Sequence, residues 1–305
     1  MSKQKIVIDC RWVRGQNIDG IGRYTLQMVQ ALLARGNQEW LYTLLFANQQ
    51  MLDWFAKQIG LERYANVDSQ ILGYPVLSGA DFLHLGQDLQ KTGADLVWLP
   101  NYMAWPFKNR SPVVMTVYDL IPFSLPELRH DLKWKIFFGT KLFAARIFKK
   151  AHSLIAISET TKTSLLDFAV QLEQKVQVVH CGVDERFFQE QPANQLLAIK
   201  QRYQLATDKQ YVLCLGRQEI YKNIGQVLSV WDQLSPQFPG FELAIAGKRG
   251  NLGQGRQSAN IKQIGYVAEE DLVGLYQGAR LFVFPSLAEG FGLSLIHISE
   301  PTRPY

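Results

Sequence analysis

Short apolar runs alternate along this chain with longer segments whose apolar residues recur at helical spacing. The run at residues 5–10 is followed by a polar loop and then by a segment in which Val29 and Leu33 share one helix face. Further strand-like runs lie at residues 41–46, 95–99, 113–117, 153–157 and 176–179. This repeated order of strand, loop and helix predicts an α/β fold with a parallel sheet covered by helices on both faces.

The pattern starts again in the second half of the chain, after a polar stretch at residues 189–194. Strand-like runs then lie at residues 211–215, 241–246, 261–264 and 281–284, with helical spacing between them. The chain has 305 residues, more than one hydrophobic core usually accommodates. We therefore expect two facing domains, one over residues 1–188 and one over residues 189–292.

Composition narrows the class of protein without fixing its function. The chain is 47% hydrophobic and 19% charged, which excludes the disordered class. Its net charge of +5 suits an anionic partner, which is a nucleic acid, an acidic membrane face or a phosphorylated substrate. The first residues form neither a secretory signal nor a membrane span, so we expect a cytoplasmic location. The three cysteines lack metal-ligand or disulfide spacing, and we expect reduced thiols and no metal.

The first connection from strand to helix carries Gly20 and Gly22, followed by Arg23. Glycine lets the main chain approach a ligand closely, and a helix N-terminus offers free N–H groups to an anion. The alternative is that this glycine pair only forms a turn.

The connection after residues 211–215 carries two cations, Arg217 and Lys222, between Gly216 and Asn223. A guanidinium and an ammonium can hold a diphosphate and stabilise the charge that it gains when a bonded group leaves. Asn223 is a candidate cap for the helix that follows. The alternative is a solvated basic loop.

A third loop follows residues 281–284 and places Glu289 before Gly290, Phe291 and Gly292. The carboxylate can accept hydrogen bonds from sugar hydroxyls while glycine N–H groups face a phosphate. The alternative is a plain surface turn.

A series of short motifs runs over nearly the whole chain. In order, they are Ile8-Asp9, Gly20-Ile21-Gly22-Arg23-Tyr24, Val117-Tyr118-Asp119-Leu120-Ile121-Pro122, Ala156-Ile157-Ser158, Gly182-Val183-Asp184, Gly216-Arg217, Lys222-Asn223, Gly265-Tyr266-Val267, Pro285-Ser286 and Glu289-Gly290-Phe291-Gly292. This series resembles the family 4 retaining glycosyltransferases of GT-B fold, and most of all their bacterial mannosyltransferase-like branch.

The resemblance implies that Arg217 and Lys222 bind the donor diphosphate and that Glu289 contacts the donor sugar. Tyr118 stands where many relatives have His, and with a pKa near 10 a tyrosine is a poor base at neutral pH. The implied substrate-binding residues are Gly20, Gly22, Arg23, Tyr118, Asp119, Gly216, Asn223, Tyr266, Val267, Gly290, Phe291 and Gly292.

The implied reaction is metal-independent transfer of a hexose, with mannose as the first expectation, and retention of anomeric configuration. The donor is GDP-mannose or a UDP-hexose, the acceptor is a glycan or a lipid-linked glycan in cell-envelope polysaccharide synthesis, and neither a cofactor nor a nucleic acid takes part. No Asp-x-Asp triad for a metal occurs in the sequence. Two alternatives stay open: a nucleotide-sugar epimerase of similar architecture, and an inactive fragment that only binds a sugar nucleotide.

Residues 132–150 combine five aromatic residues with six lysines and arginines. This mixture is typical of an interfacial helix on anionic lipid, which would make the protein peripheral on the inner face of the plasma membrane. The alternative is a core-packed helix whose lysines extend to solvent.

Residues 293–305 do not fit the pattern of the second domain. The resemblance implies a second Glu eight positions after Glu289, where this chain has His297. The segment resembles a translated sequencing adapter, so we expect it to be foreign, with the native gene continuing past Gly292. His297 and Glu300 are expected to carry no function.

Overall fold

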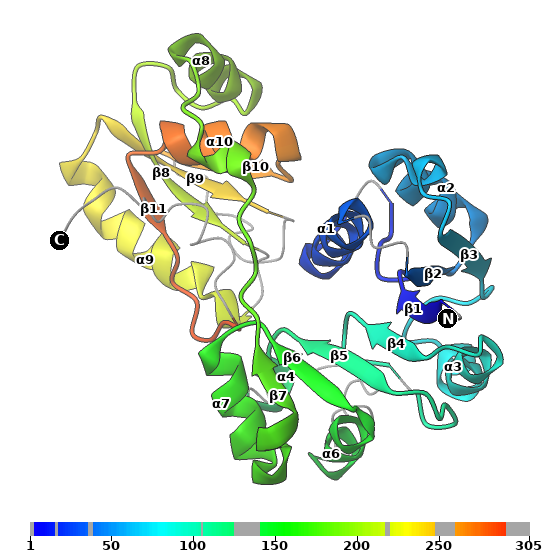
Figure 1. The fold of residues 1–305 in the computed structure, drawn as a ribbon. Helices are drawn as coiled ribbons and strands as arrows, with labels where there is room; N and C mark the ends of the chain where they lie inside the picture. The colour runs from blue at the N-terminus through cyan, green and yellow to red at the C-terminus, as the bar shows by residue number, and fades with distance from the viewer. Residues whose placement is uncertain are drawn as a thin grey trace. The chain divides into compact units, whose positions relative to one another are not determined.

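The computed structural model describes residues 3–15, 18–35, 39–104, 106–124, 141–216, 220–247 and 260–290. The chain forms two compact units, Met1–Cys181 and Gly182–Tyr305. Each unit is a parallel sheet with helices on both faces (Figure 1).

Within its described residues, the first unit has a seven-stranded sheet in the order β3-β2-β1-β4-β5-β6-β7. Its strands are β1 (Gln4–Asp9), β2 (Trp40–Phe46), β3 (Val67–Ile71), β4 (Leu96–Leu99), β5 (Val113–Val117), β6 (Ser153–Ala156) and β7 (Val176–Val178). The strand order reverses between β1 and β4, and in such sheets ligands bind outside the carboxyl ends of the strands at this reversal. The connection from β1 therefore has a favourable place for a site.

Several helices of the first unit begin at a side chain that caps them. Asp19 accepts a hydrogen bond from the amide of Gly22, and Ser158 accepts one from the amide of Thr161. Figure 1 shows α1 and α2 on one face of the sheet and α3 on the other. The elements are α1 (Gly20–Ala34), α2 (Gln49–Ile59), η1 (Leu61–Arg63), α3 (Gly79–Lys91), α4 (Ile121–Ser124), α6 (Lys141–Lys150), α7 (Glu159–Phe168) and η3 (Val170–Lys175).

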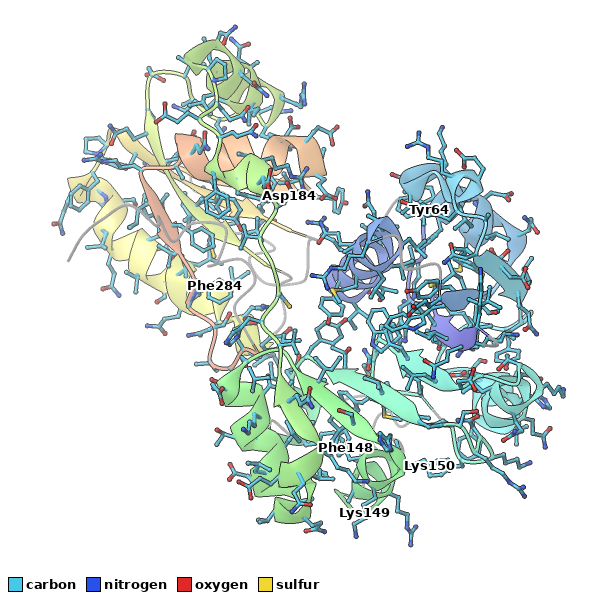
Figure 2. The ribbon with its side chains drawn as sticks, in the orientation of Figure 1. Tyr64, Phe148, Lys149, Lys150, Asp184 and Phe284 are labelled. Atoms are coloured by element: carbon cyan, nitrogen blue, oxygen red, sulfur yellow. The ribbon has the colours of Figure 1, made fainter. Side chains whose placement is uncertain are left out.

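The described part of residues 132–150 is helix α6. Ala144, Ile147 and Phe148 of this helix are buried in the core under the sheet, whereas Arg146 and Lys149 are exposed. In Figure 2, Phe148 points toward the sheet and Lys149 points away from it. The apolar side of α6 is thus occupied by the protein's own core, as the core-packed alternative requires; residues 125–140 lie outside the described residues.

The second unit has a four-stranded sheet in the order β10-β9-β8-β11 within its described residues. The strands are β8 (Gln210–Leu215), β9 (Phe241–Ala246), β10 (Ile261–Gly265) and β11 (Leu281–Val283). The other elements are η4 (Glu185–Phe188), α8 (Ala193–Arg202), η5 (Ile220–Lys222), α9 (Ile224–Leu234), η6 (Ser235–Gln237) and α10 (Glu269–Gly278).

Strand β8 supplies both cores of this unit because successive side chains of a strand point to opposite faces. Leu213 packs with α8 and α10, and Cys214 packs with α9. Helices α8 and α10 approach closely at Gly274, where an added Cβ would lie 2.2 Å from Cδ1 of Ile199. The sheet is therefore packed against helices on both of its faces.

Candidate functional site

Two loops of the second unit lie side by side at the carboxyl ends of β8 and β11. These strands are parallel neighbours, with Val283 opposite Cys214. The amide of Leu287 donates a hydrogen bond to the carbonyl of Tyr221 at 2.8 Å, which joins the two loops through their main chains. Residues distant in the sequence thus form one local site.

The centre of this site is an ion pair between Lys222 and Glu289. Nζ of Lys222 lies 2.5 Å from Oε1 of Glu289, and the two side chains are only 16% and 24% exposed. The stem of Lys222 passes Gly216, where an added Cβ would lie 3.6 Å from Cδ of the lysine. The structure therefore brings together three residues that the sequence predicts, Gly216, Lys222 and Glu289.

Two aromatic rings flank the same ammonium group. Nζ of Lys222 lies 5.1 Å from the ring centroid of Tyr221 and 5.3 Å from that of Phe284, distances at which a cation is attracted to a ring face. Phe284 follows β11 (Figure 2) and stacks on Phe282 with ring centroids 6.0 Å apart. Neither ring is predicted from the sequence as part of the site, although Tyr221 adjoins Lys222 and Phe284 directly precedes the third loop.

The structure corrects the prediction that Asn223 caps the helix that follows it. It occupies the position before α9, with φ at 53°, but its side chain makes no capping hydrogen bond to that helix. Instead Nδ2 of Asn223 donates to the carbonyl of Pro285 at 3.4 Å. The side chain therefore joins the two loops rather than capping the helix.

Other residues of the predicted donor site are only partly described. Gly290 follows Glu289 and is half-buried. Arg217, Phe291 and Gly292 lie outside the described residues.

Tyr266 and Val267 follow β10, at the same carboxyl edge of the sheet as the ion pair. Gly265 turns the chain with φ at 72°, and its carbonyl accepts a hydrogen bond from the amide of Gly247 at 2.7 Å. Tyr266 is 59% exposed, whereas Val267 packs against the core. Because β9 separates β10 from β8, the carboxyl ends of β10 and β8 lie roughly 10 Å apart, given strand spacings of about 4.8 Å.

In the glycine loop of the first unit, packing requires a glycine at one of the two positions, Gly22. An added Cβ at Gly22 would lie 2.9 Å from the carbonyl oxygen of Trp12 and 2.8 Å from Cγ1 of Ile18, so no larger residue fits. Gly20 is exposed, and a Cβ there would meet nothing within 4 Å. Arg23 is half-buried one residue further along the helix. Packing alone explains Gly22, whereas Gly20 leaves open space at the helix N-terminus.

Tyr118 lies in the same unit, directly after β5. Its ring is buried edge-on against Tyr24, with centroids 5.5 Å apart, and its hydroxyl has no hydrogen-bond partner among the described residues. Burial raises the pKa of Tyr118 far above its ordinary value, and Tyr24, Cys181 and Asp19 raise it further. The raised pKa keeps the Tyr118 hydroxyl protonated at neutral pH, so this hydroxyl can donate a hydrogen bond.

Asp119 turns the chain from β5 into the short helix α4. Its Oδ1 accepts a hydrogen bond from the amide of Ile121 at 3.0 Å, and the carboxylate is half-buried. Tyr118 is fixed by a separate bond, in which Oγ1 of Thr161 donates to its carbonyl at 2.9 Å. Both predicted residues thus have a fixed backbone at the carboxyl edge of the sheet.

A buried charged network that the sequence analysis does not identify anchors the start of the glycine loop. Nε and Nη2 of Arg11 donate to the two carboxylate oxygens of Asp9, each at 2.8 Å, and Nη1 lies 2.8 Å from Oδ1 of Asp81. All three side chains are almost wholly buried. Such a bidentate pair fixes geometry strongly, so the network holds the chain where it leaves β1.

Within the described ranges, no three His, Cys, Asp or Glu side chains are grouped so that they could hold a metal ion. None of the helices in these ranges has both the length and the apolar character needed to cross a membrane.

Comparison with solved structures identifies the fold. The Anabaena protein HepE, solved in complex with UDP and glucose, superposes with a TM-score of 0.66 at 18% identity over 97% of this chain and 78% of its own. WaaG, a glycosyltransferase involved in lipopolysaccharide biosynthesis, gives 0.66 at 13% identity over 96% and 78%. The chain has the α/β fold of GT-B type.

Among curated proteins, the O-antigen chain mannosyltransferase B of Escherichia coli is 28% identical over 193 residues, which are 60% of this chain. The aligned region is 49% of that relative, so the chain spans about half the length of the curated protein it matches.

Two family models match the chain, and together they cover both units. The model of glycosyl transferases group 1 matches residues 197–298, which include the first six residues of the segment expected to be foreign. The model of Glycosyltransferase Family 4 matches residues 18–187. Because this second match covers more than half of the chain, the protein belongs to glycosyltransferase family 4.

Proposed function

We propose that this protein transfers a hexose from a nucleotide diphosphate sugar to a glycan acceptor, with retention of anomeric configuration and without a metal ion. The observation that carries the proposal is the ammonium of Lys222, held beside Glu289 at the carboxyl edge of β8 and β11. The similarity of the chain to a mannosyltransferase supports mannose as the sugar and GDP-mannose as the first donor to test. The fold neighbour solved with UDP and glucose supports a UDP-hexose as the second.

The proposed chemistry needs a cation where the leaving group gains charge. When the bond from the sugar to the β-phosphate breaks, negative charge grows on the phosphate, and a fixed ammonium stabilises it. Lys222 supplies that ammonium, and Arg217 is proposed as the second cation. Glu289 then releases Lys222 and accepts hydrogen bonds from hydroxyls of the donor sugar.

The nucleotide end of the donor is proposed to lie toward Tyr266. This residue is exposed at the same sheet edge, two strands from the ion pair. The separation of roughly 10 Å between the ends of β8 and β10 supports a ligand whose base and phosphates are bound at different places.

In the first unit, the proposal gives Tyr118 the role of a hydrogen-bond donor to a sugar hydroxyl. Its hydroxyl is buried without a partner among the described residues, and such a group costs free energy until a ligand satisfies it. Asp119 is proposed to contact the same substrate, and the open space beside Gly20 is proposed to accommodate part of it. The similarity to an O-antigen chain mannosyltransferase supports a glycan or a lipid-linked glycan as the proposed acceptor.

We also propose peripheral membrane contact through residues 132–150, made by charged side chains and not by an apolar helix face. Because the apolar side of α6 packs in the core, contact by this helix would depend on exposed cations such as Arg146 and Lys149. Sedimentation with vesicles containing anionic lipid, compared with neutral vesicles, tests this contact. Equal sedimentation with both vesicle types would remove it.

The proposal is tested by titrating GDP-mannose, UDP-glucose and UDP-GlcNAc onto the full chain and its Lys222→Gln and Arg217→Ala variants. Loss of either cation is expected to weaken binding of the active donor about tenfold or more. Lys200→Gln is the matched control, because Lys200 also lies over a ring, that of Tyr211 at 5.7 Å, but away from the site.

Product analysis separates transfer from the alternatives. A glycosylated acceptor and free nucleoside diphosphate indicate transfer, whereas an epimerised sugar nucleotide without acceptor indicates an epimerase. If Lys222→Gln binds every donor as tightly as the unmodified chain does, the proposed site is wrong.

A further inference from the structure

The ammonium of Lys222 is confined more closely than an ion pair alone requires. Besides Glu289, it contacts the rings of Tyr221 and Phe284, and its stem lies against Gly216. Lysine side chains are almost never buried unless they are paired. The side chain of Lys222 is paired with Glu289 and is only 16% exposed. Among the described residues, its surroundings therefore include one charged group and two uncharged ring faces.

We infer that Phe284, together with Tyr221, is a positioning residue that holds the ammonium of Lys222 ready for the donor diphosphate. This inference rests on the proposed function, because it concerns how the same site prepares its cation. It gives both rings a role in phosphate binding that is separate from contact with the substrate.

The ring of Phe284 is anchored well enough to act as a support. It stacks on Phe282 with an angle of 25° between the ring planes. Phe282 in turn meets the ring of Tyr276 edge-on at 5.3 Å, and Tyr276 is buried in the core of the unit. A row of rings thus connects the position of Lys222 to the core beside β8.

An aromatic support suits a site that must accept an anion. A lysine side chain has several freely rotating bonds, and fixing it costs conformational entropy whenever it binds a ligand. Rings that restrict it beforehand reduce this cost, as preorganisation generally does. A second carboxylate would hold the ammonium as well, but it would repel the phosphate, whereas a ring carries no net charge.

The ion pair and the rings therefore have different roles in one sequence of events. Glu289 neutralises Lys222 while the site is free of ligand. When the diphosphate arrives, its charge replaces that of the carboxylate, and the rings keep the ammonium in place during this exchange. Phe284 and Tyr221 themselves touch neither the diphosphate nor the sugar in this arrangement.

The competing explanation is that Phe284 only fills space next to Phe282. A double-mutant cycle separates the two explanations, because a residue that acts through Lys222 loses its effect when Lys222 is replaced. The cycle uses the full chain with Phe284→Leu, Lys222→Gln and the double variant, and it measures the dissociation constants of UDP and GDP by calorimetry. Phe284→Tyr retains a ring, and Phe241→Leu removes a ring at the start of β9, at the opposite edge of the sheet from Lys222.

We expect Phe284→Leu to weaken binding of the nucleoside diphosphate about three- to tenfold, a range that follows from the strength of a partly desolvated cation–ring contact. Phe284→Tyr is expected to bind as the unmodified chain does. In the Lys222→Gln background, Phe284→Leu is expected to have no further effect. An equal loss in both backgrounds, or an equal loss from Phe241→Leu, would overturn the inference.

Two further measurements keep the test decisive. Tyr221→Leu removes the second ring from a half-buried position and tests the same role if Phe284→Leu fails to fold. In the ligand-free chain, NMR signals of the ε-methylene protons of Lys222 are expected upfield of ordinary lysine values and to return toward them in either ring variant. If Lys222→Gln itself does not weaken UDP or GDP binding, the proposed function fails; if it does and the ring variants bind normally, only this inference fails.

Discussion

The ammonium of Lys222 lies 2.5 Å from the carboxylate of Glu289, although 67 residues separate them in the chain. Parallel pairing of β8 with β11 brings the loops that carry them together, and the bond between Leu287 and Tyr221 fixes the loops to each other. The pair therefore reports how the second unit assembles its site, and it gives the first prediction.

Glu289→Gln is expected to strengthen binding of UDP or GDP about two- to fivefold, because Lys222 no longer has to leave a charged partner. The same variant is expected to lower transfer of the sugar at least about tenfold, because the contact with the sugar hydroxyls is weakened. Calorimetry and a transfer assay measure the two effects. Glu269→Gln, which alters a different ion pair in the same unit, serves as the control. Weaker binding of the nucleoside diphosphate to Glu289→Gln would contradict this prediction.

Tyr118→Phe is expected to leave the free energy of unfolding unchanged or to raise it by up to about 1 kcal/mol, because the lost hydroxyl has no partner among the described residues. Transfer activity is expected to fall if this hydroxyl binds substrate. Tyr211→Phe is the matched comparison, since that hydroxyl donates to the carbonyl of Leu275 at 2.7 Å, and its loss should destabilise by about 1 kcal/mol. Urea unfolding measures both, and similar losses would show that the Tyr118 hydroxyl has a structural partner.

Gly22→Ala is expected to destabilise the first unit by about 1–3 kcal/mol, because the new methyl group would press on the carbonyl of Trp12. Gly20→Ala in the same turn of α1 meets open space, and alanine favours a helix over glycine by up to about 1 kcal/mol. It is therefore expected to be neutral or stabilising. Thermal unfolding of the two variants tests the contrast, and equal melting temperatures would contradict it.

Raising the pH is expected to destabilise the second unit. Burial raises the pKa of Cys214 from 9.0 to about 11. Above pH 9 the unfolded chain loses a proton that the folded chain keeps, so stability is fully present below pH 9 and is lost as the pH rises toward 11. Between pH 8 and pH 10 this thiol accounts for a loss of about 1 kcal/mol.

Urea unfolding under reducing conditions at these two pH values measures the effect. Cys214→Ala is expected to be less stable overall but to lose about 1 kcal/mol less over the same interval. An identical pH dependence in both proteins would show that Cys214 does not titrate as described.

The regular strands of both sheets are predictable because their apolar runs are continuous. Val113–Val117 and Phe241–Ala246 match the expected ranges at both ends. Strand β3, in contrast, is not predicted by the apolar pattern. Its sequence, Val-Asp-Ser-Gln-Ile, is polar in the middle because β3 is an edge strand with little buried surface. A strand can therefore be predicted from its apolar pattern only when it buries enough side-chain surface to need apolar residues.

The candidate site is predictable to a similar degree. The positions of Lys222 and Glu289 at strand ends indicate that both lie at one edge, but no sequence pattern shows that their charged groups meet. The pairing of Arg11 with Asp81 depends on a contact between distant elements and leaves no local pattern at all. Loop residues whose partners are distant in the chain are thus the ones that sequence reasoning misses.

The two glycines at the start of α1 also bear on how homologous sequences should be interpreted. A glycine that persists at position 22 among relatives would reflect the fit of the helix against Trp12, and it would persist even in proteins that had lost their activity. Position 20 has no such steric restriction. Variation there among relatives would be compatible with the fold, and under the proposed contact with substrate it would record differences between the molecules that each protein accepts.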